Sequence, residues 1–388
     1  MLTYDKKNFM NNFGEAIEVL KKIDDAGYES YFVGGCVRDY ILGKKFDDID
    51  ITTNALPEQV KQIFKKTIDT GIQHGTVTVL VDKIPYEVTT FRTEGDYINH
   101  RTPKSVEFVT NLSMDLERRD FTINAMALDK DGKMIDLHGG ISDLENKIVR
   151  TVNDPDERFT EDALRMFRAF RFASKLDFEI ENATYKAIEK NAQLIEFVSI
   201  ERIVVEFKKL MQGTGNKRSM NLLIKSKLNN YIPFLKYINV YEDMSSYSFT
   251  QSLYYLLHFN NIEISELKKL KLSNKEINEV KDYINIQKQF NAGIEISKIL
   301  YYNSIDKVKF ISELFKLVDA KNLDAEYKNL AIKQFSDINI TNKEIIELGN
   351  KKPGPWIKET ISKLEEALLF GEIKNNNDDI KKYLIKIL

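Results

Sequence analysis

The pattern of apolar and polar residues changes near residue 150. Before that point, short apolar runs rich in β-branched residues alternate with glycines and turns, which is typical of strands. After it, apolar residues recur at helical spacing over long stretches. The sequence therefore predicts an α+β fold class, with a strand-containing N-terminal domain followed by an all-α remainder.

Several segments in the first part have the composition of strands. Residues 31–33 and 49–53 are short apolar runs, and 76–81 with 86–91 predict a hairpin. Residues 105–109 are a further candidate strand.

Helix boundaries are marked most clearly in the second part. Ser273 with Glu276, and Thr341 with Glu344, have the spacing of capping boxes and are flanked by apolar residues of the staple type. Gly349 predicts the end of a helix, and the following Pro-Gly-Pro predicts a turn.

Composition adds limits to this outline. A chain of 388 residues with 43% hydrophobic content can bury a large core, which we expect to be divided among more than one domain. Because 57 basic and 59 acidic residues nearly cancel, RNA binding would require local clusters of positive charge. The single cysteine, Cys36, cannot form an intrachain disulfide, and no signal peptide or membrane span is visible, so we expect a cytoplasmic protein with no membrane contact.

A glycine pair marks the first candidate site. The segment Val-Gly-Gly-Cys-Val-Arg-Asp ends a predicted strand and begins a predicted helix, with Gly35 and Arg38 in its centre. Backbone N–H groups at such a turn can approach a phosphate, and an arginine adds a charged donor. A purely structural glycine turn is the alternative.

Carboxylates mark the second candidate site. Asp48 and Asp50 lie two residues apart at the start of a predicted strand, so both side chains would point to one face. Such a pair suits Mg²⁺ bound to nucleotide phosphates, and Glu87 on a neighbouring predicted strand is a candidate third carboxylate. The alternatives are a solvated turn for the aspartates and a surface position for Glu87.

Two basic segments follow. In Arg118-Arg119-Asp120, the arginines are candidates for binding a triphosphate or a ribose, with a surface ion-pair cluster as the alternative. Residues 158–171 predict one amphipathic helix with Thr160 as its N-cap. Its buried stripe would consist of Ala163, Phe167 and Phe170.

Asp162 and Arg165 stand one turn apart on that predicted helix. Adenine and cytosine each present an amino donor beside a ring-nitrogen acceptor, whereas uracil and guanine present a carbonyl acceptor beside a ring N–H donor. An Asp acceptor with an Arg donor therefore matches adenine and cytosine and opposes the other two bases. A helix-stabilising ion pair is the alternative.

In chain order, the motifs GGCVRD, DDIDI, EVTTFR, RRDFTINA, DLHGG and EDALRMFRAFRF resemble those of the class II tRNA nucleotidyltransferases, a family that includes bacterial poly(A) polymerases. The resemblance covers residues from about 30 to 210. It returns at residues 352–356, Lys-Pro-Gly-Pro-Trp, which look like a tail segment of bacterial CCA-adding enzymes.

The resemblance implies four domains: a nucleotidyltransferase head with a mixed, polymerase β-like sheet (1–150), and a helical neck (151–212), body (213–290) and tail (291–388). It implies that Asp48 and Asp50 bind Mg²⁺ and that Asp162 and Arg165 form the protein template for CTP and ATP. The remaining nucleotide contacts that it implies are Gly35, Arg38, Arg119, Arg168 and Arg171.

The implied reaction is addition or repair of the CCA end of tRNA, with the acceptor end and elbow of the tRNA as the bound parts. Within the family, CC-only addition, A-only addition and poly(A) synthesis are the alternatives, and the segment 93–103 favours full CCA addition. A non-catalytic RNA-binding protein and a small-molecule nucleotidyltransferase are alternatives of other classes. The sequence leaves the oligomeric state open, a homodimer included. The candidate RNA backbone contacts are the basic residues Lys208, Lys209, Lys217, Arg218 and Lys225, with a solvated helix face as the alternative for each.

Overall fold

The computed structural model describes residues 6–94, 97–98, 102–103 and 106–388. The chain divides into two compact units, one of residues 1–249 with 256–271 and the other of residues 250–255 with 272–388. Within the described residues, no helix has the length and apolar character needed to cross a membrane.

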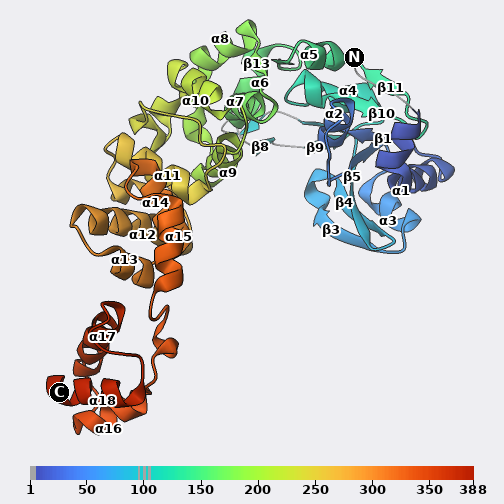
Figure 1. Ribbon diagram of the computed structural model, residues 1–388. Coiled ribbons are helices and arrows are strands. Elements are labelled where there is room, and N and C mark those ends of the chain that lie inside the picture. Colours follow the sequence, from blue (N-terminus) through green and yellow to red (C-terminus); the bar gives the residue numbers. More distant parts are fainter. Residues whose placement is uncertain (1–5, 95–96, 99–101, 104–105) are drawn as a thin grey trace. The chain divides into compact units, whose positions relative to one another are not determined.

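All described strands belong to the first unit (Figure 1). Their bounds are β1 Ser30–Val33, β2 Asp50–Thr53, β3 Thr67–Gly71, β4 Thr76–Val81, β5 Ile84–Thr90, β6 Arg92–Glu94, β7 Tyr97–Ile98, β8 Thr102–Pro103, β9 Val106–Phe108, β10 Met126–Leu128, β11 Met134–Asp136, β12 Ile148–Val149 and β13 Glu179–Ile180.

Helices predominate after residue 150. The α-helices are α1 Lys6–Asp25, α2 Gly35–Ile41, α3 Pro57–Ile63, α4 Leu112–Glu117, α5 Gly140–Glu145, α6 Pro155–Glu161, α7 Leu164–Leu176, α8 Asn182–Asn191, α9 Ile200–Met211, α10 Asn216–Lys225, α11 Phe249–Phe259, α12 Asn274–Asn291, α13 Ile296–Tyr302, α14 Ile305–Phe315, α15 Ala320–Asn329, α16 Asn342–Gly349, α17 Trp356–Leu369 and α18 Asn377–Ile387. The 3-10 helices are η1 Ile72–His74, η2 Thr122–Asn124, η3 Ala192–Phe197, η4 Leu228–Tyr231, η5 Leu235–Tyr237, η6 Ile264–Leu270 and η7 Phe335–Asp337.

The main sheet is mixed, as the family resemblance implied. Its described strands lie in the order β11-β10-β1-β2-β5-β4-β3. Strands β2 and β5 pair in parallel, whereas the other described neighbours in this sheet pair antiparallel. The parallel pair places Asp50 directly opposite Glu87. The α+β fold class predicted from the sequence is therefore confirmed.

The two faces of this sheet are covered by different helices. Phe32 of β1 stacks on Phe13 of α1, with 4.5 Å between ring centroids. The next residue, Val33, packs with Leu112 and Leu116 of α4. This alternation is the two-residue repeat of a strand that is buried on both faces.

The strands predicted at 31–33, 49–53, 76–81 and 86–91 are present with small shifts of their ends. The candidate strand at 105–109 exists as β9, but it pairs with β6 in a separate two-stranded ladder and does not join the main sheet. Within the segment 93–103, residues 95–96 and 99–101 lie outside the described part of the chain.

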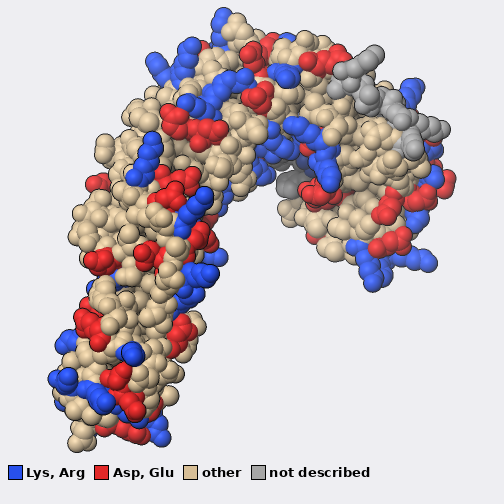
Figure 2. Space-filling view, viewed as in Figure 1, with Lys and Arg blue, Asp and Glu red and all other residues tan. Residues whose placement is uncertain are grey.

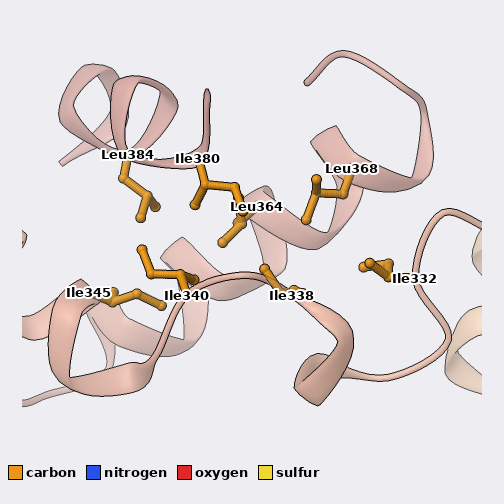
Figure 3. Packing of buried hydrophobic residues seen from close by; sticks show 8 residues of the cluster. All are labelled: Ile332, Ile338, Ile340, Ile345, Leu364, Leu368, Ile380 and Leu384. Carbon is orange, nitrogen blue, oxygen red and sulfur yellow. The ribbon is translucent and has the colours of Figure 1, made fainter. Parts of the chain in front are cut away.

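The second unit contains a separate apolar core formed by the last helices. Leu364 and Leu368 of α17 pack with Ile380 and Leu384 of α18 and with Ile345 of α16. Figure 3 shows these side chains converging on a shared interior. The indole of Trp356 packs against the same cluster.

Both predicted capping boxes are present in this unit. The hydroxyl of Ser273 accepts from the Glu276 N–H at the start of α12, and that of Thr341 accepts from the Glu344 N–H at the start of α16. In each box the glutamate side chain accepts from the cap residue's own N–H. Helix α16 ends at Gly349, as predicted.

Replacing Leu364 by alanine tests this core. The side chain is fully buried, so we expect Leu364→Ala to lower the free energy of unfolding by about 2–5 kcal/mol through lost burial and the cavity left behind. The control is Ile385→Ala in α18, where 68% of the residue is exposed and the change should stay within about 0.5 kcal/mol. Denaturant unfolding followed by the fluorescence of Trp356, the sole tryptophan, measures both, and equal shifts would contradict the packing described.

Candidate active site

A cavity of about 810 Å³ lies within the first unit, and most of its lining is charged. It brings together the turn between β1 and α2, the segment that enters β2, the end of α4, and faces of α7 and α9. The sequence-predicted residues in its lining are Gly35, Arg38, Asp48, Asp50, Arg119, Asp162, Arg165, Arg168 and Arg171. Segments that are far apart in the sequence therefore contribute to one site.

The glycine pair forms the tight turn that was predicted. Strand β1 ends at Val33 and helix α2 begins at Gly35, with Gly34 at φ 75° between them. A Cβ atom on Gly34 would lie 3.2 Å from Nη1 of Arg119 and 3.6 Å from Oδ2 of Asp50. Glycine is thus required here by the positive φ and by the close approach of two charged side chains.

Arg38 is almost fully buried beside this turn. Its Nε and Nη2 donate to the two carboxylate oxygens of Asp39 at 2.8 Å, and Nη1 donates to Oδ1 of Asn124 at 2.6 Å. The guanidinium is therefore held in one orientation at the cavity wall. Lys175 of α7 also reaches Asp39, with Nζ 3.3 Å from Oδ2.

The two aspartates of the second motif enter the cavity from the start of β2. Burial raises the pKa of Asp50, and the nearby carboxylates of Glu87 and Asp48 raise it further, while Arg119 acts in the opposite direction. The two aspartates therefore bring negative charge into a largely buried place on the cavity wall, where a cation would be favoured.

Glu87 lies opposite Asp50 in the register of β2 and β5, but its side chain is exposed and does not line the cavity. Among the described residues, no three His, Cys, Asp or Glu side chains come together as a metal-binding group. The role of Glu87 stays a prediction.

A buried carboxylate, Asp115, holds both arginines of the Arg-Arg-Asp motif. Asp115 in α4 accepts from Arg118 Nη2 at 2.6 Å and from Arg119 Nη2 at 3.0 Å. The third residue of the motif, Asp120, accepts from Arg168 Nε at 2.8 Å. This arrangement argues against the surface ion-pair cluster considered from the sequence, because Asp115 and Asp120 are buried and the arginines are partly buried in the cavity wall.

Asp120 is a buried carboxylate with a strongly lowered pKa. Burial by itself would raise its pKa, but Arg168 and the side chain of Asn124 outweigh that effect and lower the pKa to about 2. The carboxylate therefore stays ionised and fixes Arg168 on the cavity side of α7.

Three guanidiniums surround one buried aromatic ring. The Cζ atom of Arg171 lies 4.2 Å from the ring centroid of Phe172, and those of Arg38 and Arg168 each lie 5.3 Å from it. Glu206 of α9 lies 3.5 Å from Arg168 and 3.6 Å from Arg171. The ring of Phe172 thus contacts arginines of both α2 and α7, and Glu206 provides a nearby negative charge for the two arginines of α7.

The single helix predicted over 158–171 is wrong. Helix α6 ends at Glu161 and helix α7 begins at Leu164, with Asp162 in extended conformation between them. Thr160 is not an N-cap, since its hydroxyl donates to the Asp156 carbonyl inside α6. Instead, Oδ1 of Asp162 accepts from the Leu164 N–H at 3.1 Å, so the aspartate caps α7. The predicted buried stripe of Ala163, Phe167 and Phe170 is confirmed.

This break changes the partners of Asp162 and Arg165, the two residues predicted from the sequence to recognise the base. The second carboxylate oxygen of Asp162 accepts from Arg202 of α9 at 2.9 Å. The Arg165 guanidinium donates to Glu161 and, at 2.9 Å, to the Arg118 carbonyl. Asp162 and Arg165 both line the cavity, although each is held by a different partner.

Sequence reasoning missed Arg202, Lys175 and Arg92 as lining residues of this cavity. Arg202 lies in the Glu-Arg-Ile segment at the start of α9, and Lys175 continues the helical repeat of Arg168 and Arg171 by one further turn. That repeat was a usable signal for Lys175. Figure 2 shows basic side chains gathered between the places of α2 and α7 in Figure 1, with acidic ones beside them.

Gly34→Ala tests the crowding at the glycine turn. A methyl group at this position would meet Arg119 and Asp50, so we expect CTP binding to weaken by about tenfold. Gly27→Ala is the matched control, because Gly27 also has a positive φ of 90° but nothing lies within 4 Å of an added Cβ. Calorimetric titration with CTP should leave the control near wild type, and equal losses in both variants would contradict the account.

Three stretches of the chain match known protein families. Residues 30–150 match the poly A polymerase head domain, and residues 177–238 match a family described as a probable RNA and SrmB-binding site of polymerase A. Residues 248–384 match a putative domain 2 of tRNA nucleotidyltransferases. These matches cover strands and helices of both units.

Curated relatives that align with nearly the whole chain include CCA-adding enzymes. The CCA-adding enzyme of Ligilactobacillus salivarius is 39% identical, and the alignment covers 98% of each chain. That of Pediococcus pentosaceus is 42% identical over 94% of this chain and 96% of its own. The solved structure of the Bacillus stearothermophilus CCA-adding enzyme in complex with CTP matches with a TM-score of 0.87 at 35% identity, covering 97% of both chains. The chain therefore belongs to the CCA-adding enzymes, which are tRNA nucleotidyltransferases.

Proposed function

We propose that this protein adds and repairs the CCA end of tRNA with CTP and ATP, without a nucleic acid template. The observation that carries the proposal is the composition of one cavity. Carboxylates Asp48 and Asp50 line it together with the base-matching pair Asp162 and Arg165 and with the arginine side chains of both the head and α7.

The reaction follows from this arrangement. The 3′-hydroxyl oxygen of the RNA attacks the α-phosphorus of CTP or ATP, so a new P–O bond forms and the bond to the β-phosphate oxygen breaks. Pyrophosphate leaves with the electrons of the broken bond, and the hydroxyl proton passes to solvent or to a carboxylate. The protein lowers the barrier mainly by holding both reactants and by neutralising charge.

The basic side chains suit a triphosphate because they are fixed before it binds. Arg38, Arg119 and Arg168 are each held by a carboxylate, respectively Asp39, Asp115 and Asp120. A donor that already points into the cavity needs little reorganisation when charge develops on the phosphates. We therefore assign these arginines, with Gly35 and Arg171, to nucleotide binding.

Base choice would come from Asp162 and Arg165. Each oxygen of Asp162 already accepts one hydrogen bond, yet a carboxylate has about four acceptor positions and can also receive an amino group of cytosine or adenine. Uracil and guanine would instead present a carbonyl to the carboxylate and an N–H to Arg165. Such a mismatch leaves buried polar groups without partners and is strongly unfavourable.

Asp48 and Asp50 fit a divalent metal ion, and we assign them to Mg²⁺. The donors are carboxylate oxygens, which Mg²⁺ prefers, and the raised pKa of Asp50 reflects a site where added positive charge is favourable. When bound, the metal would lower the pKa of the attacking hydroxyl and neutralise charge on the phosphates. Glu87 would tune this site from the neighbouring strand.

RNA would be held through its backbone and shape. A second hollow of about 500 Å³ in the first unit is lined by Lys217, Arg218 and Lys225, and these residues lie in the segment that matches an RNA-binding family. We place the enzyme in the cytoplasm, where its RNA partner would be found.

Nucleotide incorporation tests the proposed function. Purified protein is incubated with Mg²⁺, each labelled triphosphate and tRNA transcripts that end before CCA, after C or after CC. We expect two C residues and one A in order, followed by a stop. A variant with Asp48→Asn and Asp50→Asn should add nothing, because both metal-binding carboxylates are lost while side-chain size is kept.

Other outcomes would replace the proposal by a defined alternative. Addition of C alone, of A alone or of a long A tail would move the protein to one of the related activities. No addition by the folded wild-type protein would favour an RNA-binding protein built on the same scaffold. The CCA-adding relatives at 39% and 42% identity favour full CCA addition.

A further inference from the structure

Asp115 is a buried carboxylate that does not line the cavity. It lies in α4, its side chain has no exposed surface, and no substrate can reach it. A fully buried charge is stable only when hydrogen-bonded and paired, so its contacts define its function.

Both carboxylate oxygens of Asp115 are used. Oδ1 accepts from Arg118 through Nη2 at 2.6 Å and Nε at 3.1 Å. Oδ2 accepts from Arg119 Nη2 at 3.0 Å and from the Thr52 hydroxyl at 3.4 Å. The backbone N–H of Arg92 also approaches Oδ1 at 3.4 Å. One side chain thus joins α4, the strand β2 that begins at Asp50, and both arginines of the Arg-Arg-Asp motif.

The charges around Asp115 agree with this geometry. Burial alone would raise its pKa, but Arg119 and Arg118 outweigh burial and lower it. The carboxylate is therefore ionised and holds two guanidiniums that would otherwise repel each other.

The two arginines contact different parts of the cavity wall. Nη1 of Arg119 lies against the Gly34 turn, close to Asp50. The carbonyl of Arg118 accepts from Nη2 of Arg165 at 2.9 Å. Arg118 also donates from Nε to the Arg92 carbonyl at 3.0 Å, which fixes the end of α4 against β6.

We propose that Asp115 is a positioning residue that couples the triphosphate-binding and base-reading parts of the site. Asp115 holds Arg119, a hydrogen-bond donor for the triphosphate, beside strand β2, which carries Asp50. Asp115 also holds Arg118, whose main-chain carbonyl accepts a hydrogen bond from Arg165 and orients its guanidinium. This inference rests on the proposed roles of Arg119 and Arg165. It predicts that loss of one buried charge outside the cavity changes both nucleotide affinity and base selectivity.

The first test is Asp115→Asn, which keeps the size of the side chain but removes its charge and one acceptor. The dissociation constants of CTP and UTP are measured by calorimetry, and incorporation of each is measured on a transcript lacking CCA. We expect affinity for CTP to fall by about tenfold and the preference for CTP over UTP to fall at least about fivefold, because Arg119 and Arg165 lose their fixed positions.

The matched control is Asp143→Asn. Asp143 is also a buried head carboxylate, bonded to the Thr122 hydroxyl at 2.6 Å and to Arg150 at 3.1 Å, but it does not line the cavity or contact its arginines. A general loss of stability would lower the melting temperature of both variants alike and leave the CTP to UTP ratio of dissociation constants unchanged in both. A changed ratio in Asp115→Asn alone supports the inference, and an unchanged ratio overturns it.

If Asp115→Asn does not fold, Arg118→Lys decides the matter. Lysine keeps the positive charge but loses the two-point contact with Asp115 and the bond to the Arg92 carbonyl. A lower preference for CTP over UTP in this variant supports the coupling, and wild-type preference overturns it. Wild-type protein that binds CTP but adds no nucleotide would contradict the proposed function, while the binding ratios of the variants would still decide the role of Asp115.

Discussion

The active site depends on buried carboxylates that hold arginine side chains apart and in fixed orientations. A cavity lined by many guanidiniums would be destabilised by like-charge repulsion and by burial of unpaired charge. Here most of the arginines in the lining are matched by an acidic partner that is itself buried or half-buried. These partners are Asp39 of α2, Asp115 of α4, Asp120 just before η2, Glu161 of α6 and Glu206 of α9. The result is a positively charged cavity whose donors are in place before a nucleotide binds.

The break between α6 and α7 is the second feature on which the proposed base recognition depends. In a continuous helix, Asp162 would be a side chain on a regular helical face. In the structure its backbone is extended, which lets one oxygen cap α7 and the other accept from Arg202. Arg165, freed from pairing with Asp162, is instead fixed by Glu161 and the Arg118 carbonyl. The two groups therefore present an acceptor and a donor to the cavity without neutralising each other.

Much of the fold and of the site could be predicted because the signals are local. The strand β1, the glycine turn and the first residues of α2 lie within a few residues of one another, and strand periodicity placed Asp48 and Asp50 together. The helix break was missed because apolar residues keep their helical spacing across Asp162, whereas the break itself depends on the extended backbone of that one residue and on its side-chain bond to the start of α7. Pairings such as Arg168 with Asp120 join residues 48 positions apart, and no local pattern encodes them.

The central claim is that protein side chains choose the base. It is tested most directly by measuring incorporation of CTP, ATP, UTP and GTP by Asp162→Ala beside Asp154→Ala, which removes the cap of α6 but no residue of the cavity lining. The account predicts that Asp162→Ala loses at least about tenfold of its preference for CTP and ATP over UTP and GTP, whereas Asp154→Ala keeps it. An unchanged preference in the Asp162 variant, with activity retained, would contradict base recognition by this side chain.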